Sequence, residues 1–266
     1  MSHDLLESIE DGIATLTMNR PEARNALTPE MMVALRDTLP RLAADSSVRV
    51  VVLTGAGKAF CAGGDVKRFA AQAAAGGASM SFDDRVTDLR MRMEVSRVLH
   101  EMPKPTLAVI PGPAAGAGLS MALACDMRIC ASDAKLTTAF SKVGLAGDFG
   151  GSFFLTHIVG TALARELYFT GRVFNGAEAL SMGIVNRVAE PDQLSEAATA
   201  YARELAALPT VAVGYMKRNL NVALRGSLAD NLDAEAIHMI RTFETQDHKG
   251  AAVAFVEKRA PVFAGR

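Results

Sequence analysis

The chain has 266 residues, of which 50% are hydrophobic and 21% are charged. This composition supplies ample material for a folded core and excludes an intrinsically disordered chain. The formal net charge of −1 gives no overall field that would hold nucleic acid or an anionic membrane, so neither is expected as a partner.

Cysteine usage and hydropathy indicate where the protein works. Three unpatterned cysteines exclude a disulfide framework, and Cys125 and Cys130 lie in an apolar run where small buried side chains are expected. Residues 1–12 lack the basic and apolar segments of a secretory signal, and no apolar run reaches the roughly 18 residues of a spanning helix. We therefore expect a cytoplasmic protein.

The first part of the chain alternates between strand and helix patterns. Strands are predicted at 13–18, 48–54, 106–110, 127–131 and 184–188, and the β-branched run 48–54 is typical of a strand buried on both faces. Thr28 and Pro29 predict the cap and first turn of a helix that extends to about residue 43. A flexible stretch at 71–79 precedes a second helix, which ends before Pro103. Its predicted core-facing stripe comprises Met91, Val95, Val98 and Met102.

After Pro191 the pattern becomes wholly helical, with helices predicted at 193–208, 211–224, 227–242 and 250–258. Alternating strands and helices before that point predict an α/β fold with parallel strand pairing. We expect a core of residues 1–190 and a helical region of residues 191–266.

Three short motifs lack residues that their chemistry requires. The run Gly55-Ala56-Gly57-Lys58 lacks the first glycine and the final Ser or Thr of a phosphate-binding loop. The glycines at 116 and 118 lack the third glycine of a dinucleotide-binding turn, because Met121 stands there. Ser120 lies in a near match to a nucleophile elbow, but no histidine has a marked acidic partner, which favours a buried helix serine.

Two turns of small residues, 61–65 and 114–118, each join a strand to the start of a helix. Small residues let a ligand approach the backbone, and unpaired N–H groups at a helix start favour negative charge. One donor from each turn would form an oxyanion hole. Close packing of helix on strand is the alternative interpretation.

Five segments, which together span most of the chain, resemble the crotonase superfamily of enoyl-CoA hydratases and isomerases. They are Arg20–Leu27 (RPEARNAL), Ala59–Asp65 (AFCAGGD), Gly112–Gly118, Ala134–Gly151 and Ser181–Val185. The resemblance implies a spiral of ββα units with a C-terminal α-helical region that builds a homotrimer or a dimer of trimers. It also implies a coenzyme A thioester as the substrate, with no further cofactor and no metal.

The resemblance assigns roles to particular positions. It places the oxyanion hole on the backbone N–H groups of Gly64 and Ala117. It implies that the coenzyme A channel is lined by Arg24, Ala26, Leu27, Ala62 and Asp65. Phe255 and Lys258 resemble residues that close over the nucleotide end, often from a neighbouring subunit, and the candidate basic contacts to the anionic ligand are Arg24, Lys67 and Lys258. The expected substrate pocket includes Gly116, Ser120, Phe140 and Phe149.

The chemistry depends on which carboxylates are present. Hydratases of this family use two glutamates, and the resemblance places Ser120 and Phe140 at those positions, so efficient hydration by two carboxylates is not expected. Asp148 stands where dienoyl-CoA isomerases and the epoxyphenylacetyl-CoA isomerase have their catalytic aspartate. The implied activity is an acyl-CoA isomerase that moves a double bond, or rearranges a ring epoxide, with Asp148 as the single acid/base. Apolar neighbours, namely Phe140, Leu145 and Phe149, are expected to raise its pKa by desolvation.

Other interpretations of Asp148 remain open at this stage. It could activate water alone in a hydratase, cap the helix that starts near Gly150, or be structural in a non-catalytic acyl-CoA-binding protein. An aspartate at this position is also the nucleophile of the aromatic dehalogenases in the superfamily. Those enzymes carry tryptophan at the position of Phe140, and this chain contains none.

Overall fold

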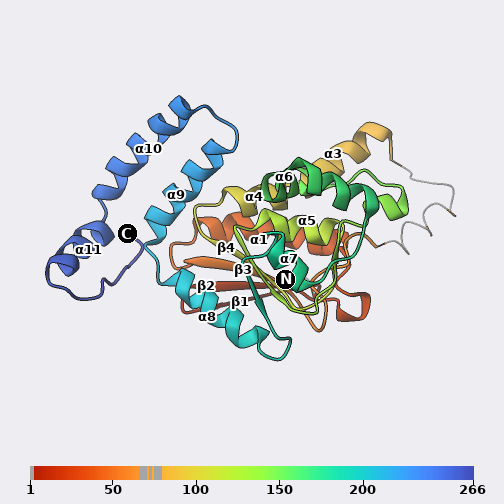
Figure 1. The fold of residues 1–266 in the computed structure, drawn as a ribbon, viewed down its shortest axis with the longest axis horizontal. Coiled ribbons are helices and arrows are strands. Elements are labelled where there is room, and N and C mark those ends of the chain that lie inside the picture. Colours follow the sequence, from red (N-terminus) through yellow and green to blue (C-terminus); the bar gives the residue numbers. More distant parts are fainter. Residues whose placement is uncertain (1–2, 66–70, 72–73, 75–79) are drawn as a thin grey trace.

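The computed structural model describes residues 3–65, 71, 74 and 80–266. Its centre is a six-stranded sheet in the order β1-β2-β3-β4-β6-β8 (Figure 1). The strands are β1 (Leu5–Glu10), β2 (Ile13–Met18), β3 (Val50–Gly55), β4 (Thr106–Ile110), β6 (Met127–Ala131) and β8 (Arg187–Ala189). β1 and β2 are antiparallel, and the other neighbours pair in parallel. β5 (Ala114–Ala115) and β7 (Leu136–Thr137) form a second, parallel pair.

Helices cover both faces of the six-stranded sheet, as a parallel sheet requires. One face carries α1 (Pro29–Ala44), α4 (Glu94–Glu101) and α5 (Ala117–Ala124), with α6 (Gly151–Thr170) packed on α5, and the other carries α8 (Leu194–Ala206) (Figure 1). The shorter helices are α3 (Phe82–Arg92) and α7 (Gly176–Ser181). Five of the six residues of β3 are buried, which explains its β-branched run. The predicted α/β class is confirmed.

The structure confirms the predicted bounds of three strands, at 13–18, 106–110 and 127–131. The Thr28 cap is also confirmed, because its hydroxyl accepts a hydrogen bond from the Met31 N–H at 3.0 Å. The predicted strand 184–188 is shorter and starts at Arg187. The edge strand β1 was missed because only Leu5 of its six residues is buried, which leaves little hydrophobic pattern to detect.

The single helix predicted before Pro103 is wrong in its extent, because the chain forms α3 and α4 with Met93 between them. Met91 is 46% exposed and does not belong to the core, whereas Val95 and Met102 are buried and Val98 packs against the core. The predicted flexible stretch at 71–79 falls almost wholly outside the described residues.

The chain after Pro191 is helical as predicted, and its parts pack differently. α8 buries six side chains under the sheet, so it extends the core. α9 (Thr210–Ala223), α10 (Leu228–Phe243) and α11 (Gln246–Val256) form an arm that projects from the core (Figure 1). We call residues 210–256 the C-terminal arm. The boundary at residue 190 stays a prediction.

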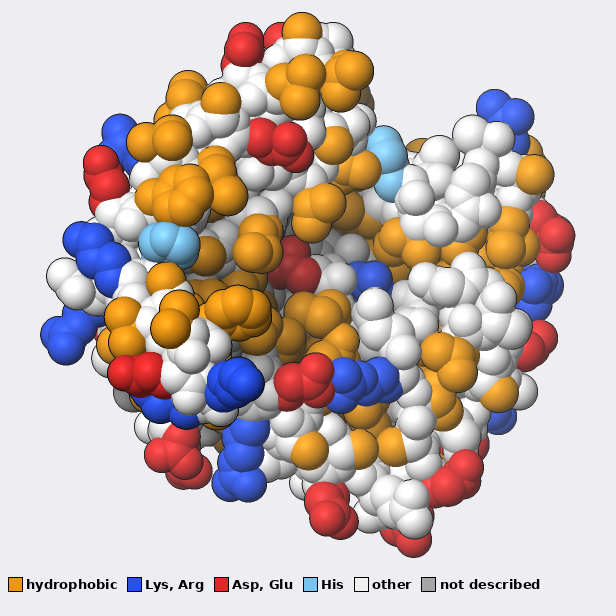
Figure 2. Space-filling view, turned by 60° about the vertical axis from the view of Figure 1, so that its left-hand side comes forward, with side chains coloured by type: hydrophobic (Ala, Val, Ile, Leu, Met, Phe, Trp, Pro, Cys, Tyr) orange, Lys and Arg blue, Asp and Glu red, His pale blue; other side chains and the backbone are white. Residues whose placement is uncertain are grey.

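The C-terminal arm exposes many apolar side chains, and α10 buries none of its residues. Figure 2 brings the side of the molecule that carries this arm forward and shows hydrophobic side chains gathered on that face. The most exposed of them are Leu220, Leu228, Ile237, Ile240, Phe255 and Val256. The trimer or hexamer stays a prediction. Within the described part of the chain, no helix is long and apolar enough to cross a membrane.

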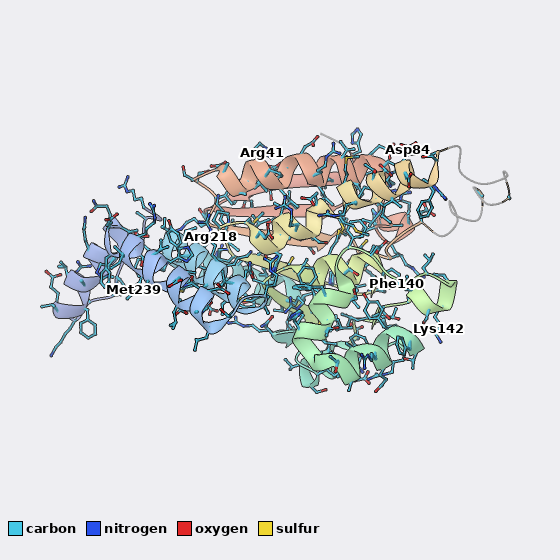
Figure 3. The ribbon with its side chains drawn as sticks, turned by 90° about the horizontal axis from the view of Figure 1, so that it is seen from above. Arg41, Asp84, Phe140, Lys142, Arg218 and Met239 are labelled. Atoms are coloured by element: carbon cyan, nitrogen blue, oxygen red, sulfur yellow. The ribbon has the colours of Figure 1, made fainter. Side chains whose placement is uncertain are left out.

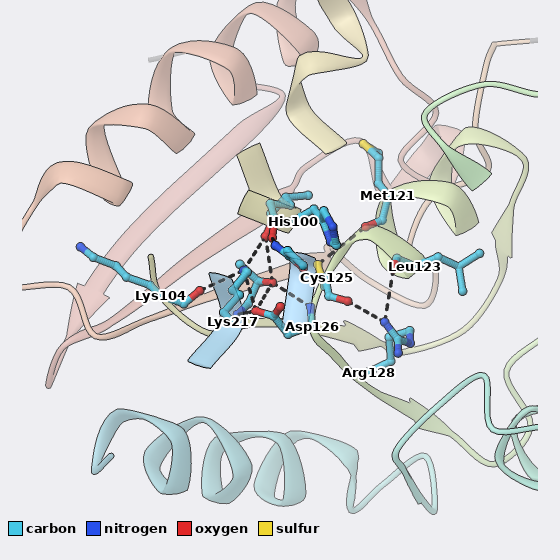
Figure 4. Close-up of polar contacts among 11 residues, drawn as sticks. His100, Lys104, Met121, Leu123, Cys125, Asp126, Arg128 and Lys217 are labelled. Atoms are coloured by element: carbon cyan, nitrogen blue, oxygen red, sulfur yellow. Dashed lines mark hydrogen bonds and ion pairs between the residues drawn. The ribbon is translucent and has the colours of Figure 1, made fainter. Parts of the chain in front are cut away.

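A buried ion pair fastens the C-terminal arm to the core (Figure 4). Lys217 on α9 is 6% exposed, and its Nζ donates to Asp126 Oδ2 at 2.7 Å and to the Leu99 and Lys104 carbonyl oxygens at 2.8 and 3.1 Å. Asp126 in turn accepts from the N–H and hydroxyl of Thr106. The ammonium is therefore bonded to groups around β4 and the end of α4.

Replacement of Lys217 by methionine should destabilise the fold by about 3 kcal/mol, because the Asp126 carboxylate and two carbonyl oxygens lose their cation. Urea unfolding followed by circular dichroism measures this change. Lys135→Met, at an exposed lysine, is the matched control and should shift the unfolding free energy by less than about 0.5 kcal/mol. Equal stability of the two variants would contradict the anchoring role.

Candidate active site

A buried asparagine shapes the first segment of the predicted coenzyme A channel. Asn25 is fully buried, and its amide group donates to the Ala56 and Ala59 carbonyl oxygens at 3.0 and 2.8 Å, while its side-chain oxygen accepts from the Arg20 N–H at 2.8 Å. Arg24 and Asn25 both have positive φ, at 50° and 56°. Asn25 was not singled out from the sequence, because its partners lie more than 30 positions away.

This segment pairs with the turn at 61–65. The Ala62 N–H donates to the Arg24 carbonyl oxygen and the Leu27 N–H donates to the Gly63 carbonyl oxygen, both at 2.9 Å. Ala26 and Asp65 are chain neighbours of these pairs, so the structure brings the five predicted channel residues to one place. Lys67, the predicted basic contact nearby, lies outside the described residues.

The two small-residue turns meet, as the oxyanion-hole prediction requires. The Ala115 N–H donates to the Cys61 carbonyl oxygen at 2.9 Å. A Cβ on Gly63 would lie 2.7 Å from the Ala115 oxygen and 3.2 Å from the Ala117 nitrogen, so only glycine fits there without displacement. α5 begins at Ala117. Among the described residues, neither the Gly64 nor the Ala117 N–H has a hydrogen-bond acceptor. Two adjacent donors are thus left for a ligand.

Asp148 lies between the 3-10 helix η2 (Phe140–Val143) and the start of α6. Its Oδ1 is buried and has no partner in the described part of the chain. The cap of α6 is Gly150, with no side-chain cap, and the Gly151 N–H bonds to the Asp148 backbone oxygen at 3.1 Å. The helix-cap interpretation of Asp148 is therefore wrong.

Burial raises the pKa of Asp148 to about 6. The predicted direction is therefore confirmed, and desolvation of the carboxylate is its cause. Phe140 and Phe149 are 7% and 3% exposed. Leu145 is 52% exposed, and its expected part in desolvating Asp148 stays a prediction.

Tyr168 on α6 is a further residue at this site. Its ring stacks on Phe140, with centroids 5.9 Å apart and planes 19° apart. A Cβ on Gly147 would lie 3.0 Å from the Tyr168 ring and 3.5 Å from the Phe140 ring. Burial, and then the charge of Asp148, raises the pKa of Tyr168 to about 12, so its phenol stays neutral. Sequence reasoning missed Tyr168 because it lies in an apolar helical run that carries no motif.

The Phe140 ring lies between the turn at 114–118 and Gly147, the residue before Asp148. A Cβ on Gly116 would lie 3.6 Å from its ring, and one on Gly147, next to Asp148, would lie 3.5 Å from it. Figure 3 shows Phe140 beside α6, with Lys142 further out on the same segment. Ser120 faces this group across Gly151, where a Cβ would lie 2.2 Å from the Ser120 Oγ and 2.5 Å from the Tyr168 hydroxyl oxygen. Of the predicted pocket, Gly116, Ser120 and Phe140 therefore converge, and Phe149 follows Asp148 directly.

Phe255 and Lys258 do not join these residues within one chain. Phe255 is 86% exposed near the end of α11, which lies in the projecting C-terminal arm, away from the core that carries α6 (Figure 1). Lys258 follows two residues after that helix, with φ of 56°. Their contact with the nucleotide end of a neighbouring subunit's ligand stays a prediction.

The serine and cysteine side chains that could act as nucleophiles are either hydrogen-bonded or kept protonated. The Ser120 hydroxyl donates to the Gly116 carbonyl oxygen at 3.2 Å, as expected for a buried helix serine. Cys61, Cys125 and Cys130 are buried as free thiols, and burial raises the pKa of each to about 12. Across the described residues, no group of three or more His, Cys, Asp or Glu side chains could hold a metal ion.

Comparison with known proteins identifies the family. The sequence model of the enoyl-CoA hydratase/isomerase family matches residues 8–266. The chain belongs to the enoyl-CoA hydratase/isomerase family. It is 34% identical to the 1,2-epoxyphenylacetyl-CoA isomerase of Escherichia coli (strain K12), with the whole of both chains covered. The predicted family is therefore confirmed.

Solved structures of relatives confirm the crotonase-type fold. The crystal structure of an enoyl-CoA hydratase from Polaromonas sp. JS666 has a TM-score of 0.90 and 32% identity, with 97% of this chain and 99% of that chain covered. The enoyl-CoA hydratase from Mycobacterium smegmatis has a TM-score of 0.88 and 30% identity, with 98% of each chain covered. As a member of this family, the protein is an enzyme expected to act on coenzyme A thioesters.

Burial of Asp148 should also set the pH dependence of stability. Its pKa is higher in the folded than in the unfolded chain, so its contribution favours folding at low pH and is lost as pH rises from about 4 to about 6. Asp148→Asn, which removes the charge, should therefore raise the unfolding free energy by about 2–3 kcal/mol at a pH of about 8 and change it little at about 4.

Urea unfolding at the two pH values measures this difference. Asp133→Asn, at an exposed aspartate, controls for the change of net charge. Destabilisation by Asp148→Asn at both pH values would show that the carboxylate has structural partners and would contradict the desolvation argument.

Proposed function

We propose that this protein is an acyl-CoA isomerase that moves a double bond, or rearranges a ring epoxide, in a coenzyme A thioester. Asp148 acts as the single acid/base, and the N–H groups of Gly64 and Ala117 form the oxyanion hole. The observation that carries the proposal is the buried Asp148 carboxylate, one oxygen of which has no partner in the described part of the chain. The family resemblance places Ser120 and Phe140 where the hydratases have their two glutamates. The similarity to an epoxyphenylacetyl-CoA isomerase supports the ring-epoxide form.

The proposed reaction is a 1,3-proton shift. The thioester oxygen accepts hydrogen bonds from Gly64 and Ala117, which stabilise the negative charge that develops on it. The Asp148 carboxylate removes a proton from the α or γ carbon, and the C–H electron pair enters the conjugated enolate. The resulting carboxylic acid returns the proton to the other carbon, so the double bond moves and the enzyme is regenerated.

Hydration makes a different demand on the site. Addition of water needs one group to activate the water and one to deliver a proton, which the paired glutamates of the family's hydratases share. Here Asp148 would have to do both, because Ser120 and Tyr168 are neutral hydroxyls, and the pKa of Tyr168 is raised to about 12. Isomerisation is therefore the better fit. A hydratase that uses Asp148 alone and a non-catalytic acyl-CoA-binding protein are the alternatives.

The proposal includes the setting of the reaction. The coenzyme A thioester is the substrate and no separate cofactor takes part. Arg24, Ala26, Leu27, Ala62 and Asp65 line the channel, and Phe255 and Lys258 of a neighbouring copy close the nucleotide end in a homotrimer or dimer of trimers. The enzyme works in the cytoplasm. The apolar surface of the C-terminal arm supports the assembly.

Asp148→Asn should abolish most of the isomerase activity. We expect kcat with 3-enoyl-CoA to fall by about 10³-fold, within the range for loss of a general base, while KM changes less than about threefold. Proton NMR of 3-enoyl-, 2-enoyl- and dienoyl-CoA thioesters in deuterated water follows double-bond migration and deuterium uptake together. Asp133→Asn serves as the control and should behave as wild type.

The same spectra separate the alternatives. Rapid conversion of 2-enoyl-CoA to 3-hydroxyacyl-CoA, unaffected by Asp148→Asn, would reject the isomerase. Bound thioester with neither exchange nor product would favour the binding protein.

The activity should depend on pH through Asp148. Because the carboxylate form is the base and its pKa is about 6, kcat/KM should rise with pH, level off above about 7 and fall about tenfold per unit below about 5. Initial rates with 3-enoyl-CoA across this range give the profile. A flat profile from about pH 5 to 8 would mean that Asp148 is not the titrating base.

A further inference from the structure

The peptide unit between Gly116 and Ala117 presents both of its polar groups to partners. Its N–H, on Ala117, is the proposed oxyanion donor. Its carbonyl oxygen, on Gly116, accepts from the Ser120 N–H at 3.0 Å and from the Ser120 hydroxyl at 3.2 Å. A trans peptide is planar, and its C=O and N–H point in opposite directions. The groups that hold the carbonyl oxygen therefore aim the N–H.

Gly116 precedes α5 and has non-helical dihedral angles, although its carbonyl oxygen accepts the first helical bond of α5. Gly116 has φ of 52° and ψ of −126°, outside the usual regions for other residues, and no side chain caps the start of α5 in the described structure. The two bonds from Ser120 are the ones that tie the Gly116 carbonyl to the first turn of α5. Only one of them comes from a side chain.

The position of the Ser120 hydroxyl is itself fixed by packing. Ser120 is 2% exposed, and the Gly151 backbone is so near that a Cβ there would lie 2.2 Å from the Oγ. The hydroxyl donates to the Gly116 oxygen at 3.2 Å, and it also interacts with the Tyr168 hydroxyl, which lowers the pKa of that phenol against the larger effect of burial. The Tyr168 hydroxyl packs against the same glycine, since a Cβ on Gly151 would lie 2.5 Å from it.

We propose that Ser120 is a positioning residue that orients and polarises the Gly116–Ala117 peptide, and thereby strengthens its N–H as an oxyanion donor. Hydrogen bonds in a chain reinforce one another in a low-dielectric interior. A donor on the carbonyl oxygen makes the N–H of the same peptide a better donor to the thioester oxygen. Ser120 thus acts at the position of a hydratase glutamate without transferring a proton. This inference rests on the proposed function, which assigns the oxyanion hole to the N–H groups of Gly64 and Ala117.

The test measures the strength of hydrogen bonding in the oxyanion hole, with a bound thioester that has no double bond to move. Difference infrared spectra of butyryl-CoA, labelled with carbon-13 at the thioester carbonyl, report how strongly the bound oxygen is hydrogen-bonded. We expect wild type to shift the carbonyl stretch to lower frequency, Ser120→Ala to lose part of that shift, and Ser120→Thr to restore it. With 3-enoyl-CoA, Ser120→Ala should lower kcat about three- to tenfold with KM within about twofold, as for loss of one neutral hydrogen bond.

Ser96→Ala is the matched control. Ser96 is also a buried helix serine, 4% exposed, but its hydroxyl has no partner among the described residues. It should leave both the carbonyl frequency and kcat at wild-type values.

Three results would overturn the inference: no shift of the carbonyl in wild type, the same carbonyl frequency in Ser120→Ala and wild type, or an equal loss of shift in Ser96→Ala. If wild type shows the Ser120-dependent shift but does not turn over any enoyl-CoA, the proposed isomerase fails while the role of Ser120 stands.

Discussion

The contact between two backbone turns at Gly63 is the constraint on which the rest of the site depends. The turns follow β3 and β4, which are parallel neighbours, so both emerge at the same edge of the sheet. They can touch only because side chains are absent. A Cβ on Gly63 would lie 2.7 Å from the Ala115 oxygen, and one on Gly118 would lie 2.3 Å from the Cys61 oxygen. This approach brings the Gly63–Gly64 backbone next to Ala115 and Ala117, which explains why small residues dominate both turns.

The site contains polar groups that the chain does not satisfy for itself. A buried polar group without a partner costs about 1–3 kcal/mol, so most proteins pair such groups. In the described structure, the two N–H groups and the Asp148 Oδ1 lack partners, while neighbouring groups such as Asn25 and the Gly116 carbonyl are fully used. The extensive core, to which β1, β2, β3, β4 and β6 contribute buried residues, offsets this cost. Among the described residues, unpaired groups also occur at Ser96, His100 and Asn231, but here an unpaired carboxylate oxygen and two unpaired N–H groups belong to the same candidate site.

Strands with a strong hydrophobic pattern could be predicted from the sequence. An edge strand, a break between two helices and residues that act through distant contacts could not. β2, β4 and β6 were predicted to the residue, because their apolar runs are bounded by turn residues. β1 escaped because an edge strand needs little apolar surface, and the break at Met93 escaped because α3 and α4 share a helical pattern. Asp148 was found through its family resemblance, while Asn25 and Tyr168 were not found. Their partners are far away in the chain, and no local pattern indicates such contacts.

The position of Asp148 next to a helix start shows how its basicity is preserved. A helix N-terminus stabilises a carboxylate and would lower its pKa, which would make Asp148 a weaker base. At α6, however, Phe149 and Gly150 have φ of 51° and 74°, and the Gly151 N–H bonds to the backbone oxygen of Asp148 instead of its carboxylate. Desolvation therefore dominates, and the pKa rises to about 6. In the isomerisation that we propose, a carboxylate of this pKa could both accept a proton from the thioester and return it, so a single residue would suffice.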